Sequence, residues 1–396
     1  MPPLQPDLDT HAQTQLPSAI ELRRDLHAHP ELGNDLPETK ARVLAALEGL
    51  GLEIIHSKET SSFIATLSTG RPGPCLLLRA DMDALPLTEE SGVDFASQNP
   101  GCMHACGHDA HTAMLVGATH LLHDQRDALT GELKLLFQSG EEGHFGARHC
   151  VEEGLIDHGR TPDAAFAIHV DAKMPVGYVA SRPGPLLAAT DEFDITVKGA
   201  GGHASMPHLA TDPIPAACEI PGAIQSMVTR EISAFDPAVI TTTMIRAGTA
   251  NNVIPETARL LGTIRSTSEP ARRRATDGLR RVAEGIAAAH GCTAAVTLHE
   301  GYPVTVNDDG FFEFVRDVAG DVLGPKGFID MSAPVMGAED FSYILDRVPG
   351  AMVFLGLRED GAEKPAPVHS NRMRLDEPGM ANGIALHAAV ALRFLS

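Results

Sequence analysis

The sequence predicts an α/β protein in which a mainly parallel sheet lies between helices and a smaller α+β domain is inserted. Short continuous apolar runs alternate with helical segments, which is typical of buried strands in a parallel sheet. A chain of 396 residues is too long for one ordinary core. Composition changes at the break SRPGP, and we expect one domain to comprise 1–185 with 301–396 and the other to comprise 186–300.

The N-terminal part predicts two helices preceded by an arm. Residues 1–16 are polar and proline-rich, so we expect them to be disordered or loosely docked. A helix is predicted from Ser18 to Pro30, because its apolar residues lie near helical spacing. Residues 38–50 form a second amphipathic helix, and Gly51 is its expected C-cap.

Four apolar runs predict buried strands, and each ends in, contains or is followed by polar groups that could carry out chemistry. The runs and their polar groups are 75–83 (Asp81, Asp83), 133–142 (Glu141, Glu142), 164–170 (His169) and, beyond a loop, 351–357 (His369). Helices are expected between them at 108–123 and 145–156. Open α/β sheets bind ligands at the carboxyl ends of their strands, so we expect these groups to lie together.

The inserted domain is predicted from alternating strands and helical segments. Phe193, Ile195 and Val197 alternate as in a half-buried strand, and a helical segment then runs to about Arg230. Pro221 lies inside that segment and predicts a kink or a broken helix. The remaining elements are strands at 238–248, 257–266 and 293–299 and a helix at 270–290.

Composition excludes several kinds of partner. The 31 basic and 52 acidic residues give a net charge of −21, which repels phosphate backbones, so no nucleic acid partner is expected. No apolar run approaches the ~18 residues that span a bilayer, so no membrane partner is expected either. Six cysteines in so long a chain do not form a disulfide framework, and we expect a cytoplasmic protein.

The segment GCMHACGHDAH, residues 101–111, concentrates metal-binding groups. A thiolate and an imidazole two residues apart suit zinc. Both Cys102 with His104 and Cys106 with His108 have this spacing, which does not choose between them, although Gly107 slightly favours the second pair by permitting a tight turn. His111 is interpreted as a helix-face residue.

The adjacent carboxylates of Glu141 and Glu142 follow a buried strand and a turn. We therefore interpret them as residues of a functional site and not as part of a solvent-exposed helix face. One can bind a metal while the other accepts a proton from water. His169 and His369 are unremarkable alone and gain meaning from their place beside the other strand ends. Asp81 is expected to contact one of the metal-binding side chains and orient it, without binding the metal itself.

Eight motifs in order resemble the metal-dependent amidohydrolases that include hippurate hydrolases, auxin-conjugate hydrolases and N-acyl-amino-acid deacylases, within the aminoacylase–carboxypeptidase metallopeptidase family. The resemblance spans about residues 20–395. The motifs are RADMDALP (79–86), MHACGHDAH (103–111), FQSGEEG (137–143), AIHV (167–170), GGHASMPH (201–208), NVIPE (252–256), GTIRS (262–266) and EDFS (339–342).

The resemblance implies a role for each candidate residue. It selects Cys106, as a thiolate bridging two divalent metal ions, over Cys102. The thiolate favours zinc as the metal, with manganese, cobalt or nickel also open. Glu141 is then the general base, and His203 serves the active site of the partner subunit in a homodimer formed by the inserted lid and dimerisation domain. The remaining implied metal ligands are His108, Glu142, His169 and His369, and the implied substrate-carboxylate ligands are Asn252 and Arg265.

The expected activity is hydrolysis of an N-acyl or N-aroyl amino acid to a carboxylic acid and a free amino acid. A metallo-carboxypeptidase or dipeptidase acting on short peptides is the alternative within the enzymes. A metal-dependent binding protein without catalysis is the alternative from another class, and the intact Glu141 argues against it.

Overall fold

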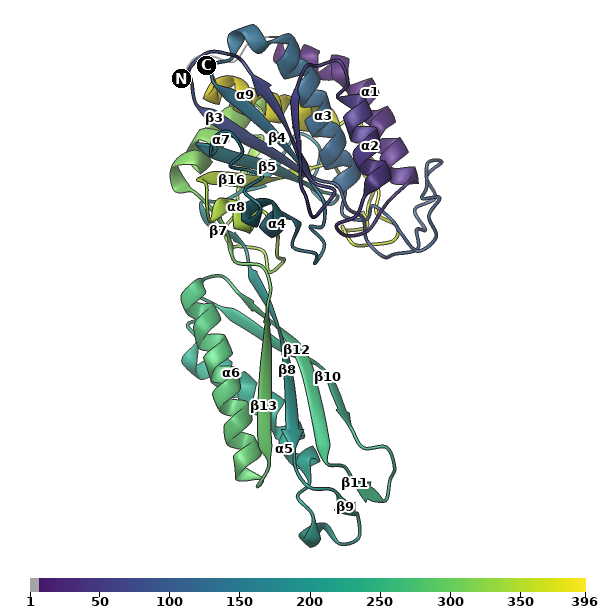
Figure 1. Ribbon diagram of the computed structural model, residues 1–396, viewed down its shortest axis with the longest axis vertical. Helices are drawn as coiled ribbons and strands as arrows, with labels where there is room; N and C mark the ends of the chain where they lie inside the picture. Colours follow the sequence, from purple (N-terminus) through teal and green to yellow (C-terminus); the bar gives the residue numbers. More distant parts are fainter. Residues whose placement is uncertain (1–6) are drawn as a thin grey trace. The chain divides into compact units, whose positions relative to one another are not determined.

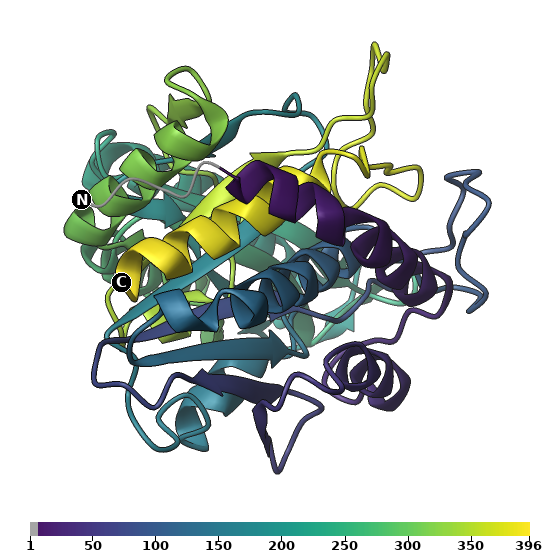
Figure 2. The same ribbon diagram turned by 90° about the horizontal axis from the view of Figure 1, so that it is seen from above.

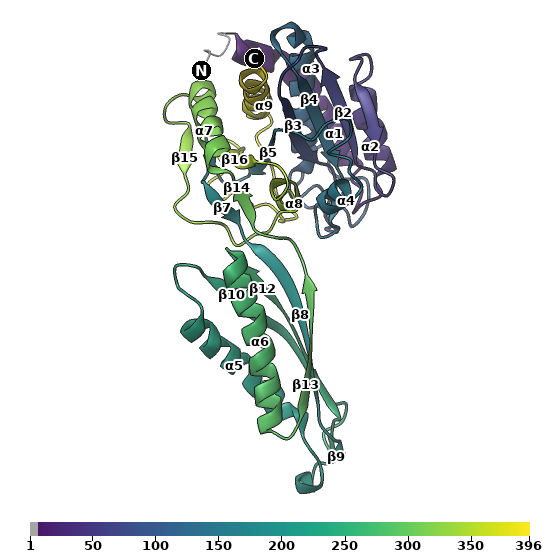
Figure 3. The ribbon, with the colours of Figure 1, turned by 60° about the vertical axis from the view of Figure 1, so that its left-hand side comes forward.

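The computed structural model describes residues 7–396, which divide into two compact units (Figures 1 and 3). The first unit extends to Leu186 and includes Val306–Ala333 and Asp340–Ser396. The second unit comprises Leu187–Thr305 and Pro334–Glu339. Within the described residues, none of the helices is both long and apolar enough to cross a membrane.

The first unit is built on an eight-stranded sheet of order β1-β2-β4-β3-β5-β16-β6-β15. Its central strands β4, β3, β5 and β16 run parallel to one another, which confirms the predicted mainly parallel sheet. The pairs β1-β2, β2-β4 and β16-β6 are antiparallel. The strands are β1 (Glu53–His56), β2 (Phe63–Ser68), β3 (Cys75–Asp81), β4 (Glu132–Gln138), β5 (Ala164–Asp171), β6 (Val179–Ser181), β15 (Phe328–Asp330) and β16 (Gly350–Gly356).

Helices α1 (Leu8–Ala28), α3 (His108–Asp124) and α9 (Met380–Phe394) pack against one another over one face of this sheet (Figure 2). The core beneath them takes alternate residues of β3, namely Leu76, Leu78 and Ala80. Helix α7 (Asp309–Leu323) packs beside α9. Side chains alternate along a strand, so Leu77, Arg79 and Asp81 face the other side.

Helices α4 (Gly146–Glu152) and α8 (Ser342–Leu345) lie at the opposite face of the sheet. The guanidinium of Arg79 donates to Asp340, two residues before α8, at 3.0 Å. The same carboxylate accepts the backbone N–H of Ala147 in α4 at 2.8 Å. The sheet is therefore enclosed by helices on both faces, with buried charges on this second face. Helix α2 (Pro37–Ala46) packs against α1 and α3.

The second unit is an antiparallel four-stranded sheet of order β10-β12-β8-β13, packed against two helices. Phe193, Ile195 and Val197 alternate along β8 and are buried, as the pattern predicted. The elements are β8 (Ala189–Lys198), α5 (Pro213–Glu231), β10 (Ala238–Ala247), β12 (Thr257–Ser266), α6 (Glu269–Ala289), β13 (Thr293–Glu300) and the ribbon of β9 (Gly202–His203) with β11 (Val253–Ile254). A separate two-stranded ribbon joins β7 (Gly184–Leu187) and β14 (Thr305–Asn307).

Three expectations about helices were wrong or incomplete. Helix α1 begins at Leu8, not Ser18, because Leu8 and Ala12 are buried in the core and extend the packed face of the helix past Pro17. Residues 1–6 of the predicted arm lie outside the described part of the chain. Helix α5 is one helix that contains Pro221, so the predicted break is absent from it. Helices α7 and α9 were not predicted, and α9 is buried along nearly its whole length, which removes the polar face that reveals a helical period.

A buried ion network fastens α1 to the start of α3. Arg23 donates to Asp109 at 3.0 Å, and His27 Nδ1 lies 2.8 Å from the same carboxylate oxygen while His27 Nε2 lies 3.1 Å from Glu89. Burial alone would lower the pKa of His27, but the hydrogen bonds to Asp109 and Glu89 raise it to about 9. The network therefore holds a charged imidazolium beside the residue that follows His108.

The stability of the chain should consequently fall with rising pH through His27. Its folded pKa is raised, so its contribution is complete below the unfolded value of about 6.5 and is lost as pH rises through about 9. The full effect is on the order of 3 kcal/mol. Urea unfolding of the wild type and His27→Gln between pH 6 and 10 should show a difference in free energy that shrinks with pH, and a constant difference would contradict the network's role.

Candidate metal centre

The carboxyl ends of three parallel strands bring polar side chains to one edge of the sheet. Asp81 at the end of β3 lies opposite Gln138 at the end of β4, and the register of Arg79 with Ala167 puts Asp81 level with His169 on β5. Glu141 and Glu142 follow β4 directly. This is the convergence that the strand ends predicted.

Five predicted ligand residues meet in overlapping groups whose ligand atoms lie within 4.8 Å of one another. Cys106 is shared by a group with His108 and His169 and by another with Glu142 and His369. A further group joins His108 to Glu141 and Glu142. Cys106 and His108 each belong to more than one group, so these groups form one continuous cluster.

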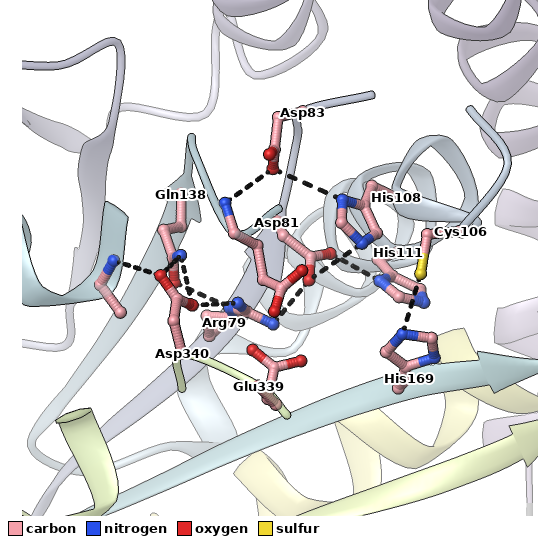
Figure 4. Close-up of polar contacts among 12 residues, drawn as sticks. Arg79, Asp81, Asp83, Cys106, His108, His111, Gln138, His169, Glu339 and Asp340 are labelled. Carbon is pink, nitrogen blue, oxygen red and sulfur yellow. Dashed lines mark hydrogen bonds and ion pairs between the residues drawn. The ribbon is translucent and has the colours of Figure 1, made fainter. Parts of the chain in front are cut away.

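The turn before α3 selects one of the two C-x-H pairs. Gly107 has φ of 92°, and a Cβ atom there would lie 2.4 Å from Val170 Cγ2, so the turn demands glycine. Cys106 then faces His169 Nε2 at 3.4 Å (Figure 4). Cys102 instead points its thiol to the carbonyl of Pro30. Spacing alone left this choice open.

Two of the histidines are oriented by backbone groups. His169 Nδ1 donates to the carbonyl of Val170 at 2.8 Å, which leaves Nε2 as the nitrogen that faces Cys106. The backbone N–H of His369 donates to the carbonyl of Ala105 at 2.7 Å. His369 has φ of 66°, rare for a residue with a side chain, and its Nε2 lies 3.3 Å from Glu142. The loop from β16 is thus tied to the cysteine turn.

Asp83 contacts three parts of the site, a role that the sequence analysis did not predict. Its two carboxylate oxygens accept the backbone N–H groups of Glu141 and Glu142, each at 3.0 Å. One of these oxygens also lies 3.5 Å from His108 Nδ1 (Figure 4). One buried carboxylate therefore positions the Glu-Glu turn and a histidine of the cluster.

Asp81 lies in a buried charged network below the cluster. It contacts His111 Nδ1 at 2.6 Å and the guanidinium of Arg79 at 2.7 Å, and it lies 3.6 Å from His108 Nε2. Burial would raise the pKa of Asp81, but Arg79 and His108 hold it well below its usual range. His111 Nε2 accepts the backbone N–H of Val170 at 2.8 Å. Both ring nitrogens of His111 are thus engaged, so it braces β3 against β5.

The cluster favours the thiolate form of Cys106. Burial alone would raise the pKa of this thiol, but the imidazoles of His169 and His108 lower it to about 6. Hydrogen bonds to Cys106 and Glu142 raise the pKa of His369 to about 10. The cluster therefore separates charge onto the thiolate and the surrounding imidazoles.

The donor set fits divalent cations. Among the described residues, neither ring nitrogen of buried His108 has a hydrogen bond, and its nearest carboxylates, those of Asp83 and Asp81, lie at ion-pair distances of 3.5 and 3.6 Å. Buried polar atoms rarely stay unpaired, and these converge with a low-pKa thiol and further imidazole nitrogens. Sulfur, nitrogen and carboxylate oxygen together suit zinc and its transition-metal neighbours.

The three other predicted site residues belong to the second unit. His203 on β9 pairs with Val253 on β11, and the carbonyl of Asn252 accepts the N–H of Ala204, so His203 and Asn252 share one exposed ribbon. Arg265 lies near the far end of β12, where it is half-buried and pairs with Thr190 and Val239. Burial lowers the pKa of Arg265.

A mainly parallel sheet whose carboxyl ends gather a thiolate, imidazoles and paired carboxylates is the framework of a metal-dependent hydrolase. Residues 77–393 match the family model described as peptidase family M20/M25/M40, and the chain belongs to this family. The family members to which this chain is similar are hydrolases of amide bonds.

Three similar proteins span nearly the whole chain. Thermostable carboxypeptidase 2 of Saccharolobus solfataricus is 39% identical over 379 residues, which are 95% of each protein. IAA-amino acid hydrolase ILR1-like 2 of Arabidopsis thaliana is 38% identical over 95% of this chain and 85% of its own. The solved structure of the Bacillus subtilis YxeP protein, a dinuclear metal-binding peptidase of family M20, has a TM-score of 0.84 and 33% identity over 96% of this chain and 98% of its own.

Replacing Asp83 with asparagine should weaken metal binding. An amide presents an NH2 group where an acceptor is needed, so one backbone N–H of the Glu-Glu turn loses its partner. Loss of such a supporting group typically costs 10- to 100-fold in metal affinity. Competition of Asp83→Asn with a fluorescent zinc chelator measures this directly. Asp127→Asn, at an exposed carboxylate, is the matched control, and equal affinities of the two variants would refute the role of Asp83.

Proposed function

We propose that the chain is a dinuclear-metal amidohydrolase that cleaves N-acyl or N-aroyl amino acids to a carboxylic acid and a free amino acid. The observation that carries the proposal is the placement of Glu141. It belongs to one group with His108 and Glu142 and to another with Glu339 and Asp340, but to neither group built on Cys106, and we therefore assign it the transfer of protons. Its backbone is held by Asp83, and only 7% of the residue is exposed.

The residues divide the reaction between them. When bound, two divalent ions activate a water molecule and polarise the scissile carbonyl. Cys106, His108, Glu142, His169 and His369 would hold them. Glu141 accepts the proton of the attacking water and delivers it to the nitrogen of the leaving amine. His203 donates a hydrogen bond to the oxyanion that develops on the acyl carbonyl, and Asp81 keeps its neighbours in place.

The substrate's carboxylate is assigned to Arg265 and Asn252. No ion pair or hydrogen bond of the Arg265 side chain occurs among the described residues, and Arg265 is half-buried, which suits a guanidinium awaiting a carboxylate. The Arabidopsis relative is named as an IAA-amino acid hydrolase, which favours amino acid conjugates. The Saccharolobus relative is named as a carboxypeptidase, so short peptides are the second candidate class. Both kinds of substrate carry a free carboxylate.

Zinc is the proposed metal because thiolate and imidazole ligands suit it, with manganese, cobalt or nickel as alternatives. We also propose a cytoplasmic location. All six cysteines are free, and the function needs Cys106 reduced, which a reducing compartment provides.

A homodimer through the second unit is proposed on two grounds. Strand β10 is the edge of its sheet and exposes Val239, Met244 and Ile245. Arg265 lies eight residues along β12 from Thr257, which is near the β9–β11 ribbon, so about 26 Å separates the two ends of the strand. One small substrate can then meet Arg265 and the ribbon residues only if they come from different subunits.

Replacing Glu141 with glutamine should abolish turnover while metal content is kept. The amide cannot accept the proton, so kcat should fall at least about 100-fold and up to about 10⁴-fold. Hippurate, N-acetyl amino acids and dipeptides, assayed with the purified protein after metal analysis, identify the substrate class. Turnover of Glu141→Gln near the wild-type rate on every substrate would overturn the assignment of the base.

Mixing two inactive variants tests the shared site. His203→Gln lacks the oxyanion donor and Glu141→Gln lacks the base, so each homodimer should be inactive. If His203 serves the partner's site, a mixed dimer has one complete site, and statistical exchange of subunits should restore about a quarter of the wild-type rate. If each His203 instead serves the site of its own subunit, every site in the mixed dimer lacks one of the two groups, and mixing should restore no activity. Size-exclusion chromatography with light scattering checks that the variants remain dimeric.

A further inference from the structure

Ser205 contacts the imidazole of His203 through two separate groups. Its backbone N–H donates to His203 Nδ1 at 3.1 Å, and its hydroxyl oxygen lies 2.8 Å from the same nitrogen. Both residues are exposed on the second unit. These contacts are independent of the cluster of metal-binding residues in the first unit.

The backbone contact determines which ring nitrogen is the acceptor. A peptide N–H can only donate, so Nδ1 must present its lone pair. The hydroxyl of Ser205 then also donates to Nδ1, and a neutral ring carries its proton on Nε2. The geometry excludes the opposite tautomer, in which two hydrogens would face each other across 3.1 Å.

The backbone around His203 is held in place as well. The carbonyl of His203 accepts the N–H of Met206 at 2.9 Å, which closes a turn over Ser205. Val253 pairs with His203 across the β9–β11 ribbon, and Ala204 donates to the carbonyl of Asn252 at 3.1 Å. The ring is therefore fixed from both its side chain and its main chain before any substrate arrives.

We propose that Ser205 is a positioning residue that sets the tautomer of His203, so that Nε2–H is the group offered to the acyl oxygen. This inference rests on the proposed oxyanion role of His203. With Nδ1 protonated instead, the outward nitrogen would be an acceptor and would repel a developing oxyanion. Ser205 would thus act on the reaction without touching the substrate.

Nitrogen NMR of the full-length metal-loaded protein labelled with ¹⁵N-histidine tests the tautomer. The spectrum of His203→Gln identifies the two signals of His203 by their absence. The wild type should show a protonated Nε2 and an unprotonated Nδ1 that accepts hydrogen bonds. Ser205→Ala keeps the peptide N–H and should retain the Nε2–H form, but with a weaker hydrogen bond and therefore a shifted signal at Nδ1, and Ser205→Thr should restore that signal. Ser205→Pro, which lacks the peptide N–H, should populate the Nδ1–H form. A wild-type Nδ1 that carries the proton would overturn the proposal.

Kinetics test the consequence. Losing one hydrogen bond of ordinary strength should lower the kcat of Ser205→Ala about two- to tenfold with little change in KM, and Ser205→Thr should recover it. Ser226→Ala, at an exposed serine of the same unit whose side chain has no hydrogen bond among the described residues, is the matched control. An unchanged Nδ1 signal and unchanged kcat in Ser205→Ala would reject the role of Ser205.

The two hypotheses fail in different ways. Full activity of His203→Gln would show that the proposed oxyanion role is wrong, whatever the tautomer. If instead His203→Gln is inactive but Ser205→Ala behaves as wild type in both measurements, only the positioning role is lost. The NMR result does not depend on turnover, so it judges the tautomer even if none of the chosen substrates is cleaved.

Discussion

The parallel register of β3, β4 and β5 is the constraint on which the site depends. It puts Asp81, Gln138 and His169 in one row, so that whatever follows each strand emerges at the same edge of the sheet. The groups delivered there are mostly charged or titratable, and their burial would be costly if they were isolated. Each is therefore paired: Arg79 with Asp81 and Asp340, Asp83 with two backbone N–H groups, and Cys106 with imidazoles.

The sequence revealed the strands and their terminal groups because both leave local patterns. A continuous apolar run followed by carboxylates or histidine is visible without the fold, and four such runs predicted where Glu141, Glu142, His169 and His369 would converge. Spacing alone left the choice between Cys102 and Cys106 open. The family resemblance selected Cys106, and the tight contact of Gly107 with Val170 shows why the turn needs glycine. Spacing describes neighbours along the chain, but this contact joins residues 63 positions apart and had no local pattern.

The role of Asp83 could not be predicted for a related reason. Its partners are the backbone N–H groups of Glu141 and Glu142, and every non-proline residue has such a group, so no residue type marks the contact. Arg79 was a missed signal, since an arginine inside a fully buried strand requires buried partners, which prove to be Asp81, Gln138 and Asp340. The predicted start of helix α1 was too late because the polar, proline-rich composition of residues 1–16 hides the two residues that it buries there, Leu8 and Ala12.

The protein prepares the cluster electrostatically before a cation is bound. Cys106, with its pKa lowered to about 6, is a thiolate at neutral pH, whereas His369, with its pKa raised to about 10, carries a proton. As the proposed ligands, both would bind a metal as unprotonated donors, so binding would displace the proton of His369, whereas the sulfur is already charged. The proton on His369 thus gives this ring a positive charge that balances the nearby thiolate of Cys106 and carboxylate of Glu142. The carbonyl of Val170 orients the ring of His169, and Ala105 and Asp83 hold the backbone of His369 and of the Glu-Glu turn, so exchanging protons for cations would need little rearrangement of the chain.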